Sequence, residues 1–302
     1  MGLFRIVLVM AAMLLPGTVC AAARQATPAS LITGTIEVDG LAMRVRTAGL
    51  EQRAPGQAAV VFESGGSAPL ETWDPILAAV ARFAPLVAYD RAGTGQSAWD
   101  SLPPTPERVS ARLRRLLSRL EVPPPYILVG HSWGGALVRY FAGSAPEQIA
   151  GVLYIDPTDI TLTRADLIAL FESFGAGAAE YEAFNRIMEQ AMSRTAAPVR
   201  AESEVIMGLL NDSLQSRKLP AAPDVPTSVI VAGRVSIPPR NLVPFDAAAY
   251  ANAMHESQVR RLRGWVMNGG TFQVAANAGH IVHADDPQLV IDAIRGLVDR
   301  TR

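Results

Sequence analysis

The segment Pro125–Gly135, which reads P-Y-I-L-V-G-H-S-W-G-G, decides how the rest of the chain can be arranged. Its apolar run Ile127–Val129 suits a strand that is buried on both faces. Gly130–Gly134 then matches the pattern G-x-S-x-G, and a helical pattern opens at Gly135. A strand that turns at once into a helix holds the middle residue, Ser132, in a strained conformation with its side chain projecting at the turn. Glycines are needed on both sides because a Cβ there would collide with the neighbouring strand or helix.

The composition excludes several classes of protein. The 302 residues are 49% hydrophobic and carry a formal net charge of -1, so no nucleic-acid or polyanion partner is indicated. The length fits one large α/β domain with an insertion, or two modest domains. No pair of histidines or carboxylates falls at ligand spacing on one element, so no metal is expected. Gly93–Gly95 lacks the Lys-Ser/Thr of a phosphate loop, and we expect no cofactor.

The N-terminus has the pattern of a secretory signal. Arg5 precedes the apolar run Ile6–Leu15, and small residues follow as far as Ala23. The apolar run is too short for a comfortable membrane span. We therefore expect residues 1–23 to be removed on export to the periplasm or the medium, leaving no stable membrane span. Cleavage would also remove Cys20, the only cysteine. A lipid anchor on Cys20 is the alternative, although the residues before it fit a lipidation site poorly.

Strand and helix patterns alternate along most of the chain. Strand patterns occur at 32–38, 41–47, 58–62, 85–89, 127–129, 151–155, 227–232 and 271–275, and helical patterns at 72–83, 106–120, 135–143, 246–265 and 287–298. The first two strands surround Asp39-Gly40, which predicts a β-hairpin. Most of the other strands are continuously apolar, which predicts a mostly parallel sheet with helices on both faces and the hairpin at its edge.

The alternation stops between Thr158 and about Pro223. Three apolar helical segments replace it, at 167–174, 181–192 and 205–214. We expect them to form a helical cap inserted after the sixth strand. The predicted organisation is a signal peptide (1–23), the first part of an α/β core (24–157), the cap (158–223) and the second part of the core (224–302). The Phe, Met and Leu residues of the cap could line an apolar substrate pocket or form the cap's own core.

The strand–turn–helix segment around Ser132 resembles the nucleophile elbow of the α/β-hydrolase superfamily. The resemblance spans Ile36–Val298 and rests on five motifs in the right order, including Asp90–Ser97, which is similar to the family's D-R-x-G-x-G-x-S turn and which we interpret as structural. It implies an α/β-hydrolase fold of the capped, esterase-like serine hydrolase branch.

A serine nucleophile needs a base within hydrogen-bond reach, a carboxylate behind that base, and donors for the oxyanion. Gly279-His280 is followed by I-V-H-A-D-D-P, which resembles the superfamily's G-H-x-x-x-x-x-x-P stretch. The resemblance implies that His280 is the general base, with His283 as a lesser candidate. His131, beside the nucleophile in sequence, is assigned a packing role.

The acid departs from the commonest family pattern. That pattern places an Asp after the strand that follows the cap, as G-x-x-D, whereas Gly233–Ser236 reads G-R-V-S. Haloalkane dehalogenases and pancreatic-type lipases carry the acid after the preceding strand, and the resemblance places Asp156 there. Asp156 could instead only cap the turn before the cap helices. Asp159 and Asp246 are the reserve candidates, because a triad is recognised by geometry rather than by sequence position.

The oxyanion donors follow from the same resemblance. One is the backbone N–H of Trp133, the residue after the nucleophile. The other comes from the loop Ser64–Ser67, where Gly66 is the first candidate and Ser67 the next.

These residues predict an exported serine hydrolase that cleaves an ester or related acyl bond of a small, apolar substrate through an acyl-enzyme on Ser132. The sequence Ser-Trp-Gly-Gly also resembles a proline-iminopeptidase-type aminopeptidase, which is the alternative enzyme. An epoxide hydrolase or dehalogenase is disfavoured, because those enzymes carry Asp at the position of Ser132. A non-catalytic ligand-binding protein on the same fold stays open, since no acid follows the strand after the cap.

Overall fold

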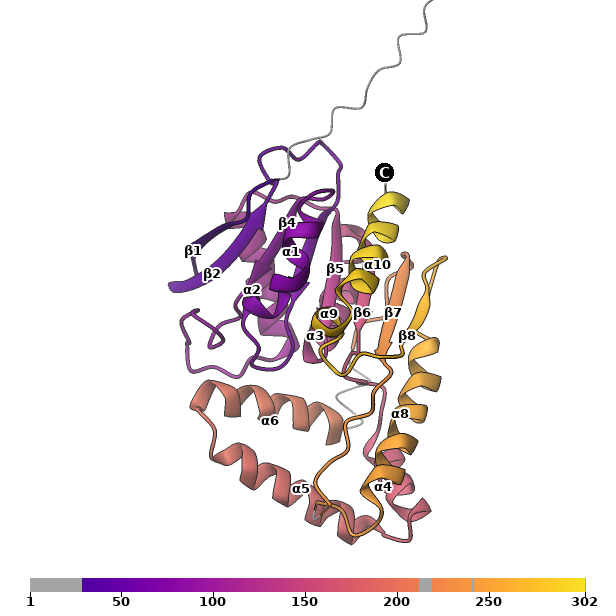
Figure 1. Ribbon diagram of the computed structural model, residues 1–302. Helices are drawn as coiled ribbons and strands as arrows, with labels where there is room; N and C mark the ends of the chain where they lie inside the picture. The colour runs from indigo at the N-terminus through magenta and orange to yellow at the C-terminus, as the bar shows by residue number, and fades with distance from the viewer. Residues whose placement is uncertain (1–28, 212–218, 241, 302) are drawn as a thin grey trace, which may run out of the picture.

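A mixed sheet forms the centre of the molecule. The computed structural model describes residues 29–211, 219–240 and 242–301, and within them eight strands pair in the order β1-β2-β4-β3-β5-β6-β7-β8 (Figure 1). The strands are β1 (Ile32–Val38), β2 (Leu41–Ala48), β3 (Ala59–Glu63), β4 (Leu86–Tyr89), β5 (Tyr126–His131), β6 (Ile149–Ile155), β7 (Thr227–Ala232) and β8 (Phe272–Ala275). The predicted signal peptide lies outside the described residues.

The N-terminal hairpin supplies the antiparallel part of the sheet. β1 pairs with β2, and β2 pairs with β4, in antiparallel fashion, whereas the pairs from β4 to β8 are parallel. Asp39 and Gly40 turn the hairpin with φ angles of 55° and 75°. A two-residue turn of this kind requires a positive φ at both positions, which Asp tolerates and Gly adopts freely. The mostly parallel α/β fold and the edge hairpin that the sequence predicts are both confirmed.

Helices cover both faces of this sheet. They are α1 (Asp74–Val80), α2 (Pro106–Arg119), α3 (Trp133–Ser144), α8 (Ala247–Arg263), α9 (Val282–Asp285) and α10 (Pro287–Arg300), with the 3-10 turns η1 (Leu70–Trp73) and η2 (Pro146–Gln148). α1, α9 and α10 pack on one face, and α2, α3 and α8 pack on the other. The layered arrangement follows from right-handed crossovers between parallel strands.

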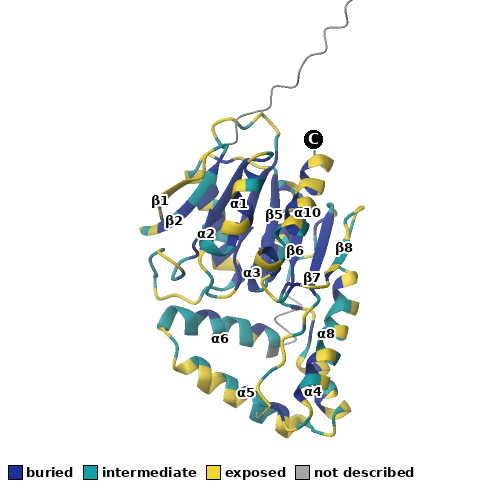
Figure 2. Ribbon diagram, viewed as in Figure 1, coloured by how far each residue is buried: buried dark blue, intermediate teal, exposed yellow. Residues whose placement is uncertain are grey.

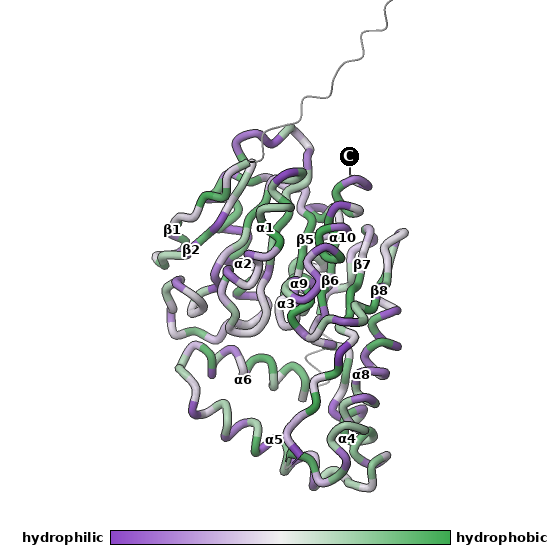
Figure 3. Tube along the Cα trace, viewed as in Figure 1, coloured by the Kyte–Doolittle hydropathy of each residue, from purple (hydrophilic) through white to green (hydrophobic). Residues whose placement is uncertain are grey.

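The core divides into two apolar layers, one on each side of the sheet. Val60 and Phe62 of β3 face α1 and α10, whereas Val61 between them faces α2 and α3. Successive side chains of a strand point to opposite faces, so a strand buried on both sides must be apolar throughout. Figure 2 shows the central strands in the colour of buried residues, and Figure 3 shows hydrophobic residues along them.

Three helices lie in the chain between β6 and β7, and we call them the insertion helices: α4 (Arg164–Ser173), α5 (Ala178–Ser193) and α6 (Ala197–Asn211). α6 lies between the core and α5 (Figure 1). Its Leu209 packs with Val109 and Trp133 of the core. The helix begins at Ala197, eight positions before the predicted start at Val205. The first two turns of the helix contain several polar residues, so the spacing of apolar residues does not indicate a helix there.

The aromatic residues of α4 and α5 form a local core. Phe171, which is fully buried, lies with its ring centroid 5.4 Å from that of Tyr181 and 5.1 Å from that of Phe245. Tyr250 of α8 closes the cluster at 5.6 Å. Much of the apolar content of the segment 158–223 therefore stabilises the insertion helices on α8. None of the described helices is both long and apolar enough to cross a membrane.

Candidate active site

Ser132 lies in a strained turn between β5 and α3. Its φ and ψ are 52° and −123°, a conformation that a residue other than glycine rarely adopts. The turn is held because the glycines on either side of it lack a side chain. A Cβ on Gly130 would lie 2.5 Å from the Gly134 carbonyl oxygen, and one on Gly134 would lie 2.2 Å from the Glu63 carbonyl oxygen. The strand, the turn and the helix can therefore pack this closely only with glycine at both positions.

His280 and Asp156 approach Ser132 from two other strand ends. The Ser132 Oγ lies 3.0 Å from the His280 Nε2, and the His280 Nδ1 lies 2.7 Å from the Asp156 Oδ2. His280 is in the loop between β8 and α9, and its side chain is half exposed. The three side chains thus form a hydrogen-bonded series at the carboxyl edge of the sheet. This is the geometry in which an imidazole can accept the proton of a serine hydroxyl.

Asp156 is fixed by contacts on both sides. It follows β6 directly with a φ of 40°, in the left-handed region that Asp tolerates better than most residues. Its Oδ1 accepts a hydrogen bond from the Ala232 N–H at 3.0 Å, while Oδ2 contacts His280. Its own N–H donates to the Ile230 carbonyl at 2.7 Å. The carboxylate is therefore oriented by β7 toward the imidazole.

The reserve acids lie elsewhere. The Asp159 carboxylate is paired with Arg261 of α8 at 2.6 Å and also accepts from Thr161. The Asp246 carboxylate caps the N-terminus of α8 by accepting the N–H groups of the helix's second and third residues. Neither contacts His280. At the commonest family position of the acid, Arg234 pairs with Asp285 at 2.6 Å instead.

The two remaining histidines near the site are buried and neutral. The His131 Nε2 lies 2.8 Å from the His280 carbonyl oxygen; a carbonyl only accepts, so this nitrogen carries the proton and donates. Burial is the main cause that lowers the pKa of His131 to about 3, and the neighbouring imidazoles of His283 and His280 add to it. Burial likewise lowers the pKa of His283 to about 4. The His283 Nε2 contacts the Thr72 hydroxyl at 3.0 Å, and its ring packs on Trp73.

The loop Ser64–Ser67 packs directly against the elbow, and we call it the oxyanion loop. A Cβ built on Gly65 would lie 3.3 Å from the Ser132 Cβ, and one on Gly66 would lie 3.9 Å from the Trp133 Cβ. The Ser67 N–H donates to a carboxylate oxygen of Glu202, so the second donor candidate is already engaged. Among the described residues, none accepts a hydrogen bond from the N–H of Gly66 or Trp133.

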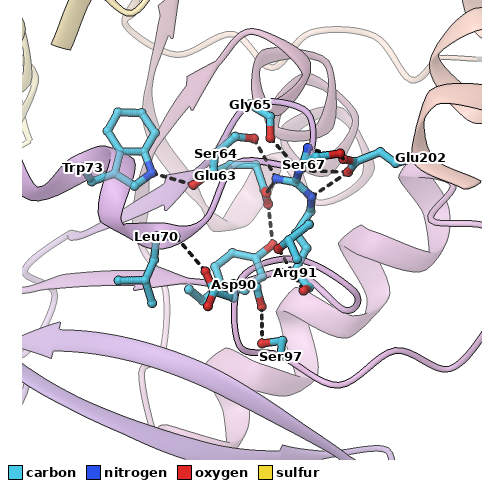
Figure 4. Close-up of polar contacts among 12 residues, drawn as sticks. Glu63, Ser64, Gly65, Ser67, Leu70, Trp73, Asp90, Arg91, Ser97 and Glu202 are labelled. Carbon is cyan, nitrogen blue, oxygen red and sulfur yellow. Dashed lines mark hydrogen bonds and ion pairs between the residues drawn. The ribbon is translucent and has the colours of Figure 1, made fainter. Parts of the chain in front are cut away.

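A buried charge cluster lies beneath this loop (Figure 4). The Arg91 guanidinium pairs with Glu63 and with Glu202 of α6, each at 2.8 Å, and all three residues are buried. Burial alone would lower the pKa of Arg91, but the carboxylates of Glu202 and Glu63 raise it. Burial raises the pKa of Glu63.

The Asp90–Ser97 turn organises the same region. The Asp90 carboxylate accepts the Leu70 N–H at 2.7 Å and the Gln96 N–H at 2.8 Å, and its carbonyl accepts the Ser97 hydroxyl. This agrees with the structural role that the sequence assigns to the turn.

Two carboxylates of the charge cluster, Glu63 and Glu202, are not identified by the sequence patterns. Glu63 could have been suspected, because it is a carboxylate that ends a strand buried on both faces. Glu202 lies in a segment that alternates polar and apolar residues, and nothing in that pattern indicates that its carboxylate is buried.

The described residues hold no cluster of three or more His, Cys, Asp or Glu side chains placed to bind a metal ion.

Comparisons with known proteins identify the family of this chain. A model of the Alpha/beta hydrolase family matches residues 60–293. An uncharacterised protein of Bacillus subtilis, YqjL, is 30% identical over 123 residues, which are 41% of this chain and 47% of that protein. An esterase of Mycobacterium tuberculosis is 26% identical over 256 residues, covering 80% of this chain and 82% of that protein. The chain spans about half of the first relative and most of the second.

The solved structures are similar in fold. The crystal structure of Cfl2 from Burkholderia cenocepacia superposes with a TM-score of 0.60 at 20% identity, covering 88% of this chain and 95% of that one. An epoxide hydrolase, CorEH, gives a TM-score of 0.63 at 16% identity and covers 90% of this chain and 100% of that one.

Proposed function

The chain belongs to the Alpha/beta hydrolase family and is a hydrolase, and we propose that it is an exported serine esterase that forms an acyl-enzyme on Ser132. The observation that carries the proposal is the hydrogen-bonded series Ser132–His280–Asp156. The chain shares its fold with epoxide hydrolases and dehalogenases, which carry an Asp nucleophile at this position. This chain has Ser132 there instead. A serine beside an imidazole forms an acyl intermediate rather than an alkyl one.

In the first half of the reaction, His280 Nε2 accepts the proton of Ser132 as Oγ attacks the carbonyl carbon. The carbonyl oxygen becomes an oxyanion, and the N–H groups of Trp133 and Gly66 donate to it. Such donors, held rigidly where charge develops, lower the barrier by about 3 kcal/mol each. His280 then gives its proton to the leaving alcohol, and the acyl group stays on Ser132.

In the second half, His280 deprotonates a water molecule that attacks the acyl carbon. The second oxyanion collapses, Ser132 Oγ leaves, and His280 returns the proton to it. Asp156 holds the Nδ1–H of His280 throughout, which keeps Nε2 free to accept a proton and stabilises the imidazolium that forms twice in each turnover.

The surroundings support an apolar acyl or alcohol group. The Ile206 Cδ1 lies 3.5 Å from the position that a Cβ on Gly66 would take, so α6 places an aliphatic side chain beside the oxyanion donors. Val205 packs with Trp133 in the same cluster. We propose that the insertion helices act as a cap whose α6 limits the substrate to small apolar esters. The relative from Mycobacterium tuberculosis that is named an esterase supports the same reaction class.

Export remains part of the proposal and rests on the sequence of residues 1–23. A purified mature chain beginning near Arg24 should be active, because every residue named in the site described above follows it in the sequence.

A p-nitrophenyl ester series tests the function. Acetate, butyrate, octanoate and palmitate esters are hydrolysed by the wild-type chain and by Ser132→Ala under the same conditions. We expect turnover of the short and medium chains by the wild type and a loss of about 10⁶-fold in Ser132→Ala. Equal rates in the two proteins would contradict the proposal. Complete inactivity of the wild type would favour the non-catalytic binding protein, and release of proline from prolyl p-nitroanilide without ester turnover would favour the aminopeptidase.

A further inference from the structure

Two side chains, those of Arg91 and Glu202, hold the backbone of the oxyanion loop. Arg91 donates from Nη1 to the Ser64 carbonyl and from Nη2 to the Gly65 carbonyl, both at 2.7 Å. Glu202 accepts the Ser67 N–H with Oε2 and lies 3.3 Å from the Ser67 hydroxyl (Figure 4). Every peptide group on either side of Gly66 is therefore held by one of these two residues.

The planarity of the peptide bond turns these contacts into a constraint on the Gly66 N–H. The carbonyl of Gly65 and the N–H of Gly66 belong to one peptide group, and in a trans peptide they point in opposite directions. Because Arg91 holds the Gly65 carbonyl, the Gly66 N–H must point away from Arg91. A Cβ on Gly66 would lie 3.9 Å from the Trp133 Cβ, so the backbone segments that carry the two N–H groups assigned to the oxyanion are close neighbours.

Glu202 completes this constraint and comes from the insertion, not from the core. Its Oε1 pairs with the Arg91 Nε at 2.9 Å while its Oε2 holds Ser67, so it fixes the arginine and the loop together. Ser67 has a φ of 55°, a conformation that a serine keeps only where the surroundings impose it. Without Glu202, the Ser67 N–H would lose its acceptor and the strain in this residue could relax.

We propose that Glu202 is a positioning residue through which helix α6 orients the Gly66 N–H, so that the oxyanion hole is complete only while α6 is docked on the core. The proposal rests on the esterase function proposed above. It assigns the insertion a part in transition-state stabilisation in addition to covering the site. A ligand that lifted α6 would switch off the chemistry even with Ser132, His280 and Asp156 in place.

The test separates an effect on the oxyanion from an effect on the fold. Glu202→Ala, Glu202→Gln and the control Glu204→Gln, an exposed residue on the same helix, are compared with the wild type. For each, kcat and KM are measured on p-nitrophenyl butyrate. The inhibition constant of an aliphatic trifluoromethyl ketone is measured as well, because its hemiketal with Ser132 carries an oxyanion.

We expect Glu202→Ala to lower kcat by about 10- to 100-fold, less than the loss of a donor outright, with KM changed by no more than about threefold. The inhibition constant should rise by the same factor as kcat/KM falls. Glu202→Gln keeps an acceptor for Ser67 but not the charge opposite Arg91, and should lose roughly tenfold. Glu204→Gln should match the wild type.

Glu202→Gln has the shape of the native residue. If Glu202→Ala does not fold, the kcat and the inhibition constant of Glu202→Gln test the inference instead. Unchanged kcat and an unchanged inhibition constant in a folded Glu202 variant would overturn the inference and leave the esterase function standing. A wild-type chain that hydrolyses no ester would remove the proposed function and this inference with it.

Discussion

The carboxylate of Asp156 lies 2.7 Å from the imidazole of His280, although 124 residues separate them in the chain. The contact exists because β6 and β8 lie on the same side of β5, with β7 between them, and the parallel strands from β5 to β8 end at one edge of the sheet. A carboxylate that follows β6 can therefore contact the imidazole in the same way as a carboxylate that follows β7. The absence of an acid at Gly233–Ser236 is thus compatible with a complete series of side chains.

This relationship gives a direct prediction about the acid. Asp156→Asn should lower kcat by about 10⁴-fold, because the amide cannot orient the imidazole as the carboxylate does. Asp246→Asn serves as the matched control, since Asn caps a helix as well as Asp and Asp246 has no contact with His280. Hydrolysis of p-nitrophenyl butyrate measures both. Activity that survives in Asp156→Asn and disappears in Asp246→Asn would move the acid to Asp246.

The buried histidines predict a loss of stability in acid. Burial lowers the pKa of His131 to about 3 and that of His283 to about 4, against 6.5 for an ordinary histidine. The unfolded chain therefore binds more protons below pH 6.5, so the stabilisation is complete above that pH and is lost as the pH falls toward the folded values. From about pH 6.5 to about pH 5, each imidazole should reduce the free energy of unfolding by about 2 kcal/mol.

Urea unfolding at several pH values measures this effect. His283→Gln keeps a donor for the Thr72 hydroxyl but cannot titrate, and it should remove about half of the pH dependence that the two histidines cause. A variant with the same pH dependence as the wild type would show that His283 is not the source.

The charge cluster predicts that Arg91 contributes more to the free energy of unfolding than an exposed arginine does. Arg91→Met leaves the buried carboxylates of Glu63 and Glu202 without a counter-charge, and should cost about 3–5 kcal/mol of unfolding free energy. The control is Arg115→Met, which removes a half-exposed partner of Asp39 and should cost no more than about 1 kcal/mol. Urea unfolding compares the two, and similar losses would contradict the assignment.

The close packing at the elbow predicts that alanine in place of Gly134 destabilises the fold. In Gly134→Ala the new Cβ would meet the backbone of Glu63 and Ser64, and neither can move without displacing β3 or the oxyanion loop. We expect a loss of about 1–3 kcal/mol or more. Gly34→Ala on β1, where no atom lies within 4 Å of the new Cβ, should be close to neutral. Thermal unfolding followed by circular dichroism distinguishes them, and equal midpoints would argue against the crowding.

The sequence was most informative where a function depends on neighbouring residues. The elbow around Ser132 is a local pattern, and the loop that carries His280 is recognised from a few consecutive residues, so both follow from the amino-acid sequence alone. For the acid that contacts the imidazole, the sequence leaves three candidates, Asp156, Asp159 and Asp246. The choice among them depends on which strand ends lie next to each other in the fold, and no local pattern shows this. In the structure, the latter two are engaged with Arg261 and with the start of α8.

The contribution of Glu202 could not be predicted at all. A glutamate in a helical segment is usually solvated, and nothing in the spacing around it shows that α6 turns this face toward the core. Its role depends on Arg91, which is 111 residues away, and on the burial of both. The sequence places the start of α6 too late for the same reason, because a buried polar residue breaks the apolar pattern on which such a prediction depends.

The central claim is that Ser132 is an activated nucleophile, and labelling with a fluorophosphonate tests it most directly. The mature chain and Ser132→Ala are incubated with the reagent, and the adduct is located by mass spectrometry of proteolytic fragments. We expect one adduct per chain, on Ser132, and none in the variant, with the labelling rate greatly reduced in Asp156→Asn. No adduct on the wild-type chain, or an adduct on a different residue, would contradict the claim.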